Sequence, residues 1–499
     1  MYNSGMYWPF SSKKQKINNR TTLWIALLAL GAMGVSLWIG MQQSVWFDES
    51  YSILVAQQKI PEIVHLASVD THPPAYYILL RLWANVFGWE ELALRTLSAL
   101  AFGGSVFIMG LLVKRQFGTR AALAATALAV VTPLLVRYGF EIRMYSVASL
   151  IGIAATYVMV KARESSKNNV WPWVAYAVLV TLGMLTLYYL ALLWIAHVAW
   201  LLYMDRARLK KVWQLPWVYA YAAAALMFAP WLPAFLGQVN NGALASIGQP
   251  MNLEQLLGVL SFNTLYKPVW QLNVIDTVAV LMFLAMLISA YMVAWRNKNY
   301  RSSLLLLTAY IAVPIIVLML VSLARPMYVE RYLSHVAIGL TALIGVLLAF
   351  LTEEGSRIKR SVVYAGVAAV MVAGLVNLIG VGNFNFQRMQ KPAIASAVQP
   401  IDCVGASVVA ADPYVATELS YYLPKTCDIH FYSQWKTLGG GYAPFSESPL
   451  MIQTMEVPQL ASRLYYAHYD TPKLTIPANY QQVASNTNGG LTVTEYEAR

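Results

Sequence analysis

Two adjacent carboxylates, Asp48 and Glu49, follow the first long hydrophobic stretch of the chain. They stand beside Trp46 and Phe47, whose rings favour the boundary between membrane and water. Charged groups at that depth are costly unless they face water, a partner or a substrate. A carboxylate there can act as a general base that removes the proton of a hydroxyl group. We therefore take Asp48 as the candidate base and Glu49 as a further catalytic candidate that orients neighbouring basic groups or the substrate.

Other residues with acid–base or anion-binding chemistry recur beside later hydrophobic stretches. The candidates are Asp70, His72 and Tyr77 in one polar segment, Glu141 and Arg143 in a second, and Arg325, Arg331 and Tyr332 in a third. Glu141 is a catalytic candidate, and the others are candidates for substrate binding. Arginine and histidine side chains can hold and neutralise a phosphate, arginine in bidentate geometry. Because a leaving phosphate needs such charge, the pattern predicts transfer of a group from a lipid phosphate, although these residues do not identify the group.

Each of these groups also has a simpler interpretation. The arginines of the third segment can reach lipid headgroups while their stems stay in hydrocarbon. Glu141 can form a structural ion pair with a nearby arginine, and His72 can be an ordinary loop residue. Asp48 is harder to explain in this way, because no basic residue follows it before Lys59.

The composition places these residues in a membrane protein. Of the 499 residues, 58% are hydrophobic and only 12% are charged, whereas soluble domains are about a quarter charged. The apolar residues gather in runs such as 22–41 and 361–381, and roughly 20 apolar residues suffice to cross a bilayer. We therefore predict a polytopic membrane protein whose first run is a retained helix rather than a signal peptide.

Positive charge indicates which side of the membrane each loop occupies. Twenty of the 35 Lys and Arg residues fall in six short clusters, at 13–20, 114–120, 161–167, 206–211, 296–301 and 357–360. Such clusters mark the cytoplasmic side, and they explain the formal net charge of +12 without a nucleic acid partner. We expect residues 1–21 in the cytoplasm, and the first loop, 44–91, and the C-terminal end outside the cytoplasmic membrane.

The membrane domain, residues 22–383, is expected to be all-α with about eleven spans. The expected spans are about 22–43, 92–113, 119–136, 144–160, two within 170–204, 212–236, 274–295, 302–322, 332–351 and 361–382. Residues 73–88 are too short to cross the bilayer. We therefore expect them to form an interfacial helix within the first outer loop.

Residues 384–499 differ from the rest in pattern. Short apolar runs alternate with turn residues such as the glycines at 439–441, which is typical of a small α/β domain. The two cysteines of the chain, Cys403 and Cys427, both fall in this exported segment. An even pair there indicates a disulfide bond, and two buried free thiols are the alternative.

Five motifs, taken together, resemble those of GT-C membrane glycosyltransferases. They are WFDESY at 46–51, DTHPPAYY at 70–77, RTLSAL at 95–100, YGFEIRMY at 138–145 and ERYL at 330–333. The chain resembles the family-39/83 enzymes, which include protein O-mannosyltransferases and the lipid A aminoarabinose transferase. Its later motifs are similar to those of bacterial putative mannosyltransferases, and the similarity covers about residues 40–350.

The resemblance implies a polyprenyl-phosphate-linked monosaccharide as donor, with mannose or another hexose or pentose as the sugar. It also implies an inverting transfer in one displacement, in which Asp48 activates the acceptor and Glu141 matches the second acidic site. His72 takes the place of the basic residue before Pro-Pro, near the donor phosphate, and Arg331 and Arg325 are further phosphate contacts. The acceptor is a glycan, a lipid or a protein.

No Asp-x-Asp pattern occurs in the expected outer loops, which argues against a metal site like that of oligosaccharyltransferases. A divalent metal bridging Asp48 and Glu141 stays open, and no other cofactor is expected.

A transporter or flippase is the main alternative function, but it would place polar residues near the midplane. An O-antigen ligase or polymerase would use a diphosphate donor, which the arginines do not distinguish. A non-enzymatic assembly or sensor protein would leave the polar cluster unexplained.

Overall fold

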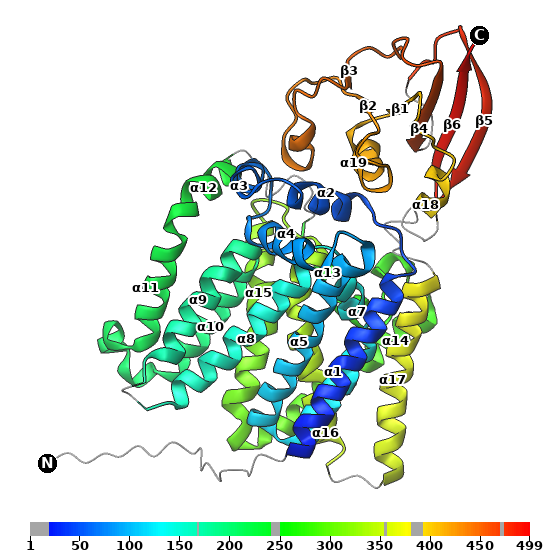
Figure 1. The fold of residues 1–499 in the computed structure, drawn as a ribbon. Coiled ribbons are helices and arrows are strands. Elements are labelled where there is room, and N and C mark those ends of the chain that lie inside the picture. The colour runs from blue at the N-terminus through cyan, green and yellow to red at the C-terminus, as the bar shows by residue number, and fades with distance from the viewer. Residues whose placement is uncertain (1–18, 167–168, 241–249, 354–356, 381–392, 470–473) are drawn as a thin grey trace, which may run out of the picture.

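A bundle of long helices carries a smaller domain with a β-sheet at one end (Figure 1). The computed structural model describes residues 19–166, 169–240, 250–353, 357–380, 393–469 and 474–499. The expected segment 1–21 lies mostly outside the described residues, and so does the expected domain boundary at 383/384. This architecture confirms the expected fold class, an all-α membrane domain followed by an α/β domain.

The bundle consists of fourteen α-helices within the described residues, several of them linked by short 3-10 turns. The helices are α1 (Asn19–Gly40), α5 (Glu91–Phe117), α6 (Thr119–Val131), α7 (Pro133–Phe140), α8 (Tyr145–Glu164), α9 (Trp171–Thr186), α10 (Leu190–Met204), α11 (Pro216–Phe228), α12 (Leu232–Asn240), α13 (Leu253–Thr264), α14 (Val274–Arg296), α15 (Arg301–Ser322), α16 (Ser334–Leu351) and α17 (Arg357–Gly380). The 3-10 turns are η1 (Arg206–Gln214), η2 (Ala229–Trp231), η4 (Val269–Gln271), η5 (Lys298–Tyr300) and η6 (Glu330–Leu333).

The number of spans agrees with the expected eleven to within a few helices. Within the described residues, eight helices are long and apolar enough to cross a membrane, or up to ten if each bent pair is one span. One bent pair is α6 with α7, which turn by 63° at Pro133, where the ring removes a helix hydrogen bond. The other pair is α10 with η1, and α9, with 16 residues, is a shorter apolar helix. Each expected span contains at least one of the bundle helices.

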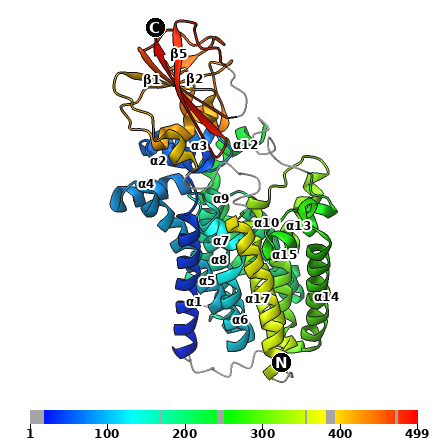
Figure 2. The ribbon, with the colours of Figure 1, turned by 90° about the vertical axis from the view of Figure 1, so that its right-hand side faces the viewer.

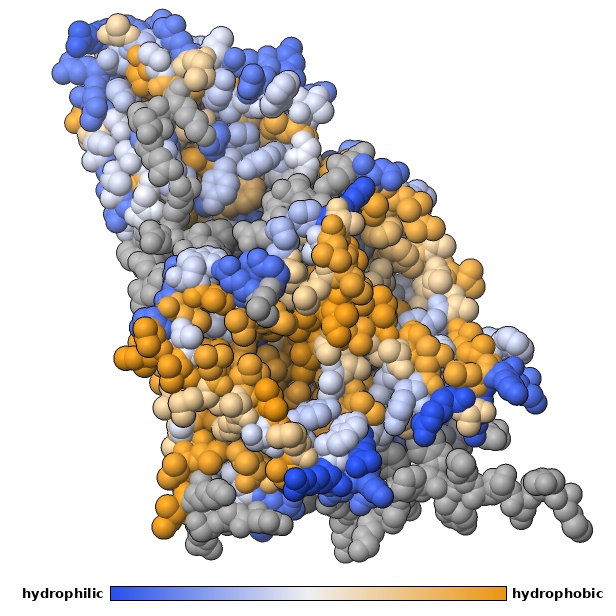
Figure 3. Space-filling view, turned by 180° about the vertical axis from the view of Figure 1, so that it is seen from behind, coloured by the Kyte–Doolittle hydropathy of each residue, from blue (hydrophilic) through white to orange (hydrophobic). Residues whose placement is uncertain are grey.

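Small residues let the central helices approach closely. A Cβ added to Gly110 of α5 would lie 2.6 Å from Ile25 of α1, and a Cβ added to Gly345 of α16 would overlap Ala125 of α6. Such close backbone contacts are typical of helix packing in membranes, where lipid leaves no hydrophobic force between helices. The outside of the bundle is largely apolar in the view from behind, whereas the C-terminal domain is mostly hydrophilic (Figure 3).

Three short helices lie across one end of the bundle, between it and the C-terminal domain (Figures 1 and 2). They are α2 (Phe47–Ala56), α3 (Ile60–Val69) and α4 (Ala75–Phe87). The helix expected at 73–88 is therefore present, and it begins directly after Pro74. Its Tyr76 and Tyr77 are buried, whereas Val86 and Phe87 are exposed, as expected for a helix that lies on a surface.

The C-terminal domain contains a six-stranded mixed sheet in the order β3-β2-β1-β4-β6-β5. The first four strands pair in parallel, and β6 pairs antiparallel with β4 and β5. Its elements are α18 (Ala393–Val398), β1 (Ala406–Ala410), α19 (Pro413–Tyr422), β2 (Ile429–Tyr432), η8 (Gly440–Phe445), β3 (Met451–Ile452), β4 (Arg463–Tyr469), β5 (Tyr480–Asn488) and β6 (Leu491–Ala498). A disulfide bond joins Cys403 to Cys427, with 5.4 Å between their Cα atoms.

The C-terminal domain packs directly on α2. The ring of Tyr414 in α19 stacks on the ring of Phe47 with 4.5 Å between centroids and an interplanar angle of 6°. The hydroxyl of Tyr422, at the end of α19, donates a hydrogen bond of 3.0 Å to the carbonyl of Val45. The helix that carries Asp48 is therefore held between the bundle and the C-terminal domain.

Candidate active site

Helix α2 begins at Phe47, so Asp48 and Glu49 both lie in its first turn. Carboxylates are favoured there because the first backbone N–H groups of a helix lack partners and give this end a partial positive charge. Successive residues of a helix point about 100° apart. The two neighbouring carboxylates therefore have different surroundings, although they are adjacent in sequence.

Glu49 is buried and bound on every side by the protein. One carboxylate oxygen accepts a hydrogen bond of 2.9 Å from the backbone N–H of Ile142. The other lies 3.1 Å from the guanidinium of Arg95 in α5 and 3.4 Å from the backbone nitrogen of Trp46. Burial raises the pKa of Glu49 from 4.5 to about 7, against the opposing effect of Arg95. Glu49 therefore connects α2, α5 and the segment after α7, and it does not face an open space.

Glu141 follows α7 and is buried beside Glu49. Its Oε1 accepts a hydrogen bond of 3.0 Å from the indole N–H of Trp46 and lies 3.5 Å from the guanidinium of Arg137. Its backbone carbonyl accepts a hydrogen bond of 2.6 Å from the hydroxyl of Ser98. The simple alternative of an ion pair with Arg137 is therefore present in the structure. The same contacts bring Glu141 to the start of α2, next to the two carboxylates there.

Of the three carboxylates Asp48, Glu49 and Glu141, Asp48 is the one whose side chain stays partly exposed to solvent. Its side chain is 15% exposed, and Oδ2 lies 3.7 Å from the guanidinium of Arg331. Within the described part of the chain, this oxygen has no hydrogen-bond partner. Arg143 lies on the other side and donates to the backbone carbonyl of Asp48 (3.3 Å) and to the hydroxyl of Ser52 (3.1 Å). Asp48 thus has two guanidinium groups beside it, and its buried Oδ2 forms an ion pair with Arg331 but no hydrogen bond within the described residues.

Asp70 and Tyr77 form a second buried group beside Asp48. The Tyr77 hydroxyl donates to a carboxylate oxygen of Asp70 (3.3 Å), and burial raises the pKa of Asp70. The structure places both near Arg143, whose charge opposes that effect of burial on Asp70.

His72 lies in the same cluster, with its ring 5.6 Å from the ring of Tyr332. Burial lowers its pKa well below 6.5, and the charges of Arg143 and Arg331 lower it further. The ring is therefore neutral at pH 7, whereas the sequence suggested a basic residue at this position. The positive charge of the cluster comes from the arginines.

Arg325 is the candidate that the structure does not bring into the cluster. Its side chain is exposed, and its guanidinium donates to the backbone carbonyl of Val239 at the end of α12 (3.3 Å). Tyr332, in contrast, is buried at the centre of a group of rings, 4.7 Å from Tyr189 and 6.4 Å from Tyr145.

Two residues of the cluster were not among the candidates from sequence. Arg95 was part of a motif, and a charge inside a hydrophobic span is a recognised sign of function; the structure pairs it with Glu49. For Trp46, the sequence indicated only a position at the boundary between membrane and water. Its indole donates to Glu141, and the guanidinium of Arg331 lies 6.0 Å from its ring. No local sequence pattern indicates this second role.

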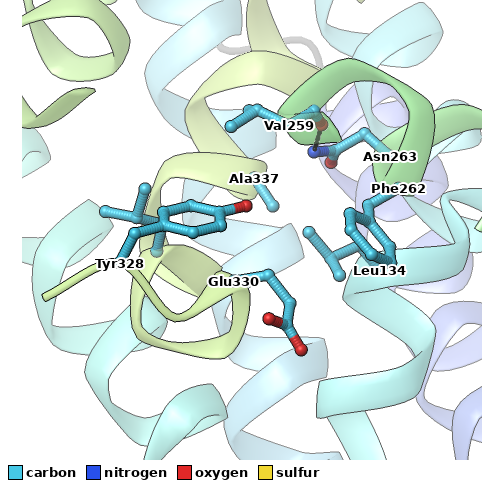
Figure 4. A pocket seen from close by; sticks show the side chains of 8 residues that line it. Leu134, Val259, Phe262, Asn263, Tyr328, Glu330 and Ala337 are labelled. Carbon is cyan, nitrogen blue, oxygen red and sulfur yellow. Dashed lines mark hydrogen bonds between the residues drawn. The ribbon is translucent and has the colours of Figure 1, made fainter. Parts of the chain in front are cut away.

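A narrow pocket lies beside η6 (Figure 4). Its walls come from α7, α13, η6 and α16, and it is lined by Leu134, Val259, Phe262, Asn263, Tyr328, Glu330, Leu333 and Ala337. Figure 4 shows Tyr328 entering from one side, opposite Phe262 and Leu134. The pocket is thus mainly apolar with a polar edge, and Glu330 of this edge directly precedes Arg331.

The described residues contain no group of three or more His, Cys, Asp or Glu side chains that could hold a metal ion. What the cluster offers instead is a partly exposed carboxylate between two guanidinium groups, with a neutral histidine and several tyrosines around them. Such a group can accept a proton and stabilise an anion at the same place.

Comparison with known proteins gives one family match and several structures with a similar fold. Residues 71–233 match the family described as dolichyl-phosphate-mannose-protein mannosyltransferase, and no curated protein sequence matches the chain. ArnT from Cupriavidus metallidurans bound to undecaprenyl phosphate superposes with a TM-score of 0.63 and 14% identity, over 95% of this chain and 98% of that one.

Two archaeal structures are also similar. The Archaeoglobus fulgidus oligosaccharyltransferase in the apo form gives a TM-score of 0.51 at 11% identity, over 82% of this chain and 64% of that one. AglB from Archaeoglobus fulgidus in complex with an inhibitory peptide and a dolichol-phosphate gives 0.50 at 11% identity, over 89% and 69%.

Proposed function

The chain has the GT-C fold of membrane glycosyltransferases over nearly its whole length, and from this fold we propose an inverting transfer reaction. A monosaccharide, either a hexose such as mannose or a pentose, moves from a polyprenyl-phosphate carrier to an acceptor hydroxyl. The acceptor oxygen attacks the anomeric carbon, the bond from that carbon to the phosphate oxygen breaks, and the hydroxyl proton passes to Asp48. The polyprenyl phosphate leaves with one more negative charge.

The observation that carries this proposal is the difference between Asp48 and its two acidic neighbours. Both oxygens of Glu49 contact the protein, and so does Oε1 of Glu141. Oε2 of Glu141 and Oδ2 of Asp48 both lack a hydrogen-bond partner within the described residues. The side chain of Glu141 is nearly fully buried, however, whereas Asp48 keeps 15% of its side-chain surface exposed. A single displacement needs one base, and Asp48 is the carboxylate that is placed for it.

Arg331 and Arg143 are the proposed contacts of the donor phosphate. Arg331 lies 3.7 Å from Asp48, and Arg143 contacts the backbone of Asp48 from the other side. Charge on a leaving phosphate is stabilised by guanidinium groups that are already in position. A phosphate beside His72 would also raise the pKa of its ring, so His72 would become a hydrogen-bond donor when the carrier binds.

The carrier class rests on both kinds of comparison. ArnT was solved with undecaprenyl phosphate and AglB with a dolichol-phosphate, and the matching family is named for a dolichyl-phosphate sugar. The basic clusters put the reaction on the outer face of the cytoplasmic membrane, with the N-terminus inside.

The test is the Asp48→Asn variant of the full-length protein in lipid nanodiscs. A panel of labelled undecaprenyl-phosphate monosaccharides serves as donors, and loss of label from the carrier is measured. The variant should bind undecaprenyl phosphate and melt like the wild type, but turn over about 10²- to 10⁴-fold more slowly, as expected for a lost general base. Glu62→Gln, an exposed acid in the same loop, is the matched control. Turnover near that of the wild type in Asp48→Asn would refute the assignment.

A further inference from the structure

Two aromatic rings gather over Phe47, the residue that precedes Asp48, and form a group of three rings with it. Phe47 stacks on Tyr414 of α19, and its ring centroid lies 5.5 Å from that of Tyr442 in η8, at an interplanar angle of 55°. Because of this angle, Phe47 and Tyr442 do not cover each other face to face. All three rings are only partly buried. Two of them come from the C-terminal domain, which Figure 1 shows over α2.

Two carboxylates, those of Asp48 and Asp412, lie near these rings. Asp412 precedes α19, and its side chain accepts a hydrogen bond of 3.0 Å from the backbone N–H of Val415. The pKa of Tyr442 is raised by burial, and further by the negative charges of Asp412 and Asp48. Tyr442 therefore lies close enough to both carboxylates for their charges to act on its hydroxyl.

The sequence builds this arrangement with glycine and a short 3-10 turn. Gly440 has a φ of +57°, a conformation that glycine adopts at little cost, and it starts η8. A Cβ on Gly441 would stand 3.5 Å from the Phe47 ring, so the turn itself passes along this ring. The hydrogen bond from the Tyr422 hydroxyl to the carbonyl of Val45 joins the two domains at the opposite end of α19 from Tyr414. The rings are thus held in place by both domains.

We propose that Phe47, Tyr414 and Tyr442 form the wall of the acceptor site and bind a sugar ring of a glycan acceptor beside Asp48. This proposal rests on the proposed function, because it identifies the class of molecule whose hydroxyl Asp48 deprotonates. The C–H face of a pyranose packs on aromatic rings, which offer large apolar area at low cost in conformational entropy. Its hydroxyl groups can donate to nearby carboxylates. Asp48 and Asp412 together disfavour an anionic acceptor at this wall.

The test measures saccharide binding without any transfer reaction. Saturation-transfer NMR is recorded on the full-length protein in nanodiscs, with millimolar mannobiose, maltose and cellobiose as probes. The wild type should give a signal from at least one disaccharide. Tyr442→Ala should weaken that binding about two- to tenfold, the size of one lost aromatic contact, while undecaprenyl phosphate raises the melting temperature as in the wild type.

Two further variants separate binding from structure. Tyr442→Phe keeps the ring and should retain most of the signal. Tyr422→Phe removes the hydrogen bond to Val45 and so weakens domain docking, but it should leave saccharide binding in place. An equal loss in Tyr422→Phe and Tyr442→Ala would overturn the proposal in favour of a purely structural contact.

Other outcomes also decide the question. No signal from the disaccharides would overturn the proposal, as would a signal that Tyr442→Ala does not change. A signal that depends on Tyr442 but comes only from a Ser/Thr-rich peptide would overturn it in favour of a protein acceptor. A wild type that binds disaccharide but never releases sugar from any carrier would instead contradict the proposed function alone.

Discussion

Replacing Glu49 by glutamine is expected to change activity and stability in different directions. The carboxylate holds the backbone of Ile142, next to Glu141, and the guanidinium of Arg95, while it lies one residue after Asp48. The Glu49 carboxylate therefore holds together the two segments that carry Asp48 and Glu141. Glutamine has nearly the same shape, but its NH₂ group cannot accept a hydrogen bond from Arg95.

The effect on stability depends on pH, and its sign follows from the pKa. Burial raises the pKa of Glu49 from 4.5 to about 7, so the folded state keeps a proton that the unfolded state releases in that range. The stability contributed by the protonated carboxyl is complete below about pH 4.5 and is lost as the pH rises to about 7. A rise of about 2.5 pKa units corresponds to about 3 kcal/mol. Glutamine does not titrate, so the variant lacks this loss.

The assay compares the melting of Glu49→Gln and wild type between pH 5 and pH 8. Subtracting one curve from the other removes the groups that titrate in both proteins. The variant should gain about 2 to 3 kcal/mol relative to the wild type over this range, because part of the effect lies below pH 5. If the difference in stability between Glu49→Gln and the wild type did not change with pH, the inferred effect of burial on the pKa of Glu49 would be refuted.

The effect on activity should be a loss that is largest above about pH 7, where the carboxyl group of Glu49 is ionised. Without the ion pair to Arg95, the start of α2 and the segment at Ile142 can shift relative to each other, and a displacement of about 1 Å at a reacting group can cost about 100-fold. We expect kcat to fall by about 10- to 100-fold with little change in carrier binding. Glu62→Gln again provides the control, and wild-type turnover in Glu49→Gln would show that this carboxylate does not position the site.

Three further predictions address the phosphate site, the disulfide bond of the C-terminal domain and the side of the membrane on which the C-terminus lies. Arg331→Gln should weaken the binding of undecaprenyl phosphate by about tenfold or more, the value of a charge-assisted hydrogen bond, whereas Arg325→Gln, whose side chain is exposed, should bind it normally in the same thermal-shift assay. Equal effects would contradict the division between the two arginines. Reduction of the bond between Cys403 and Cys427, which are 24 residues apart, should destabilise the C-terminal domain by about 3 kcal/mol. An alkaline phosphatase fused after Arg499 should be active, since that enzyme needs the oxidising outer side, and an inactive fusion would place the C-terminus inside.

Much of the fold was accessible from sequence because a membrane restricts the possible structures. Apolar runs of sufficient length must be helices in lipid, where backbone groups have no water to bind. The short run at 73–88 was correctly expected to be a helix that does not span. The bend at Pro133 is a local effect of proline, yet its angle of 63° depends on the helices around it.

The structure brings together most of the site residues expected from sequence, but not all of them. Hydropathy and charge brought Asp48, His72, Glu141 and Arg331 to one end of the bundle, and the structure places them in one cluster. Arg325 had the same local appearance as Arg331 but lies exposed beside α12. Five residues lie between these arginines, and only the path of the chain around η6 gives them different neighbours.

The sequence by itself determined the membrane architecture, the order of the motifs and the end of the bundle where polar residues gather, because the cost of polar groups in lipid acts on each segment separately. The tertiary structure alone decided which of the two neighbouring carboxylates stays partly exposed. Asp48 and Glu49 are neighbours in sequence, but Glu49 is engaged by Arg95 and Ile142, 46 and 93 residues away. The contact of Tyr422 with Val45 spans 377 residues. Contacts between segments so distant depend on how the whole chain packs, which no local pattern of residues contains.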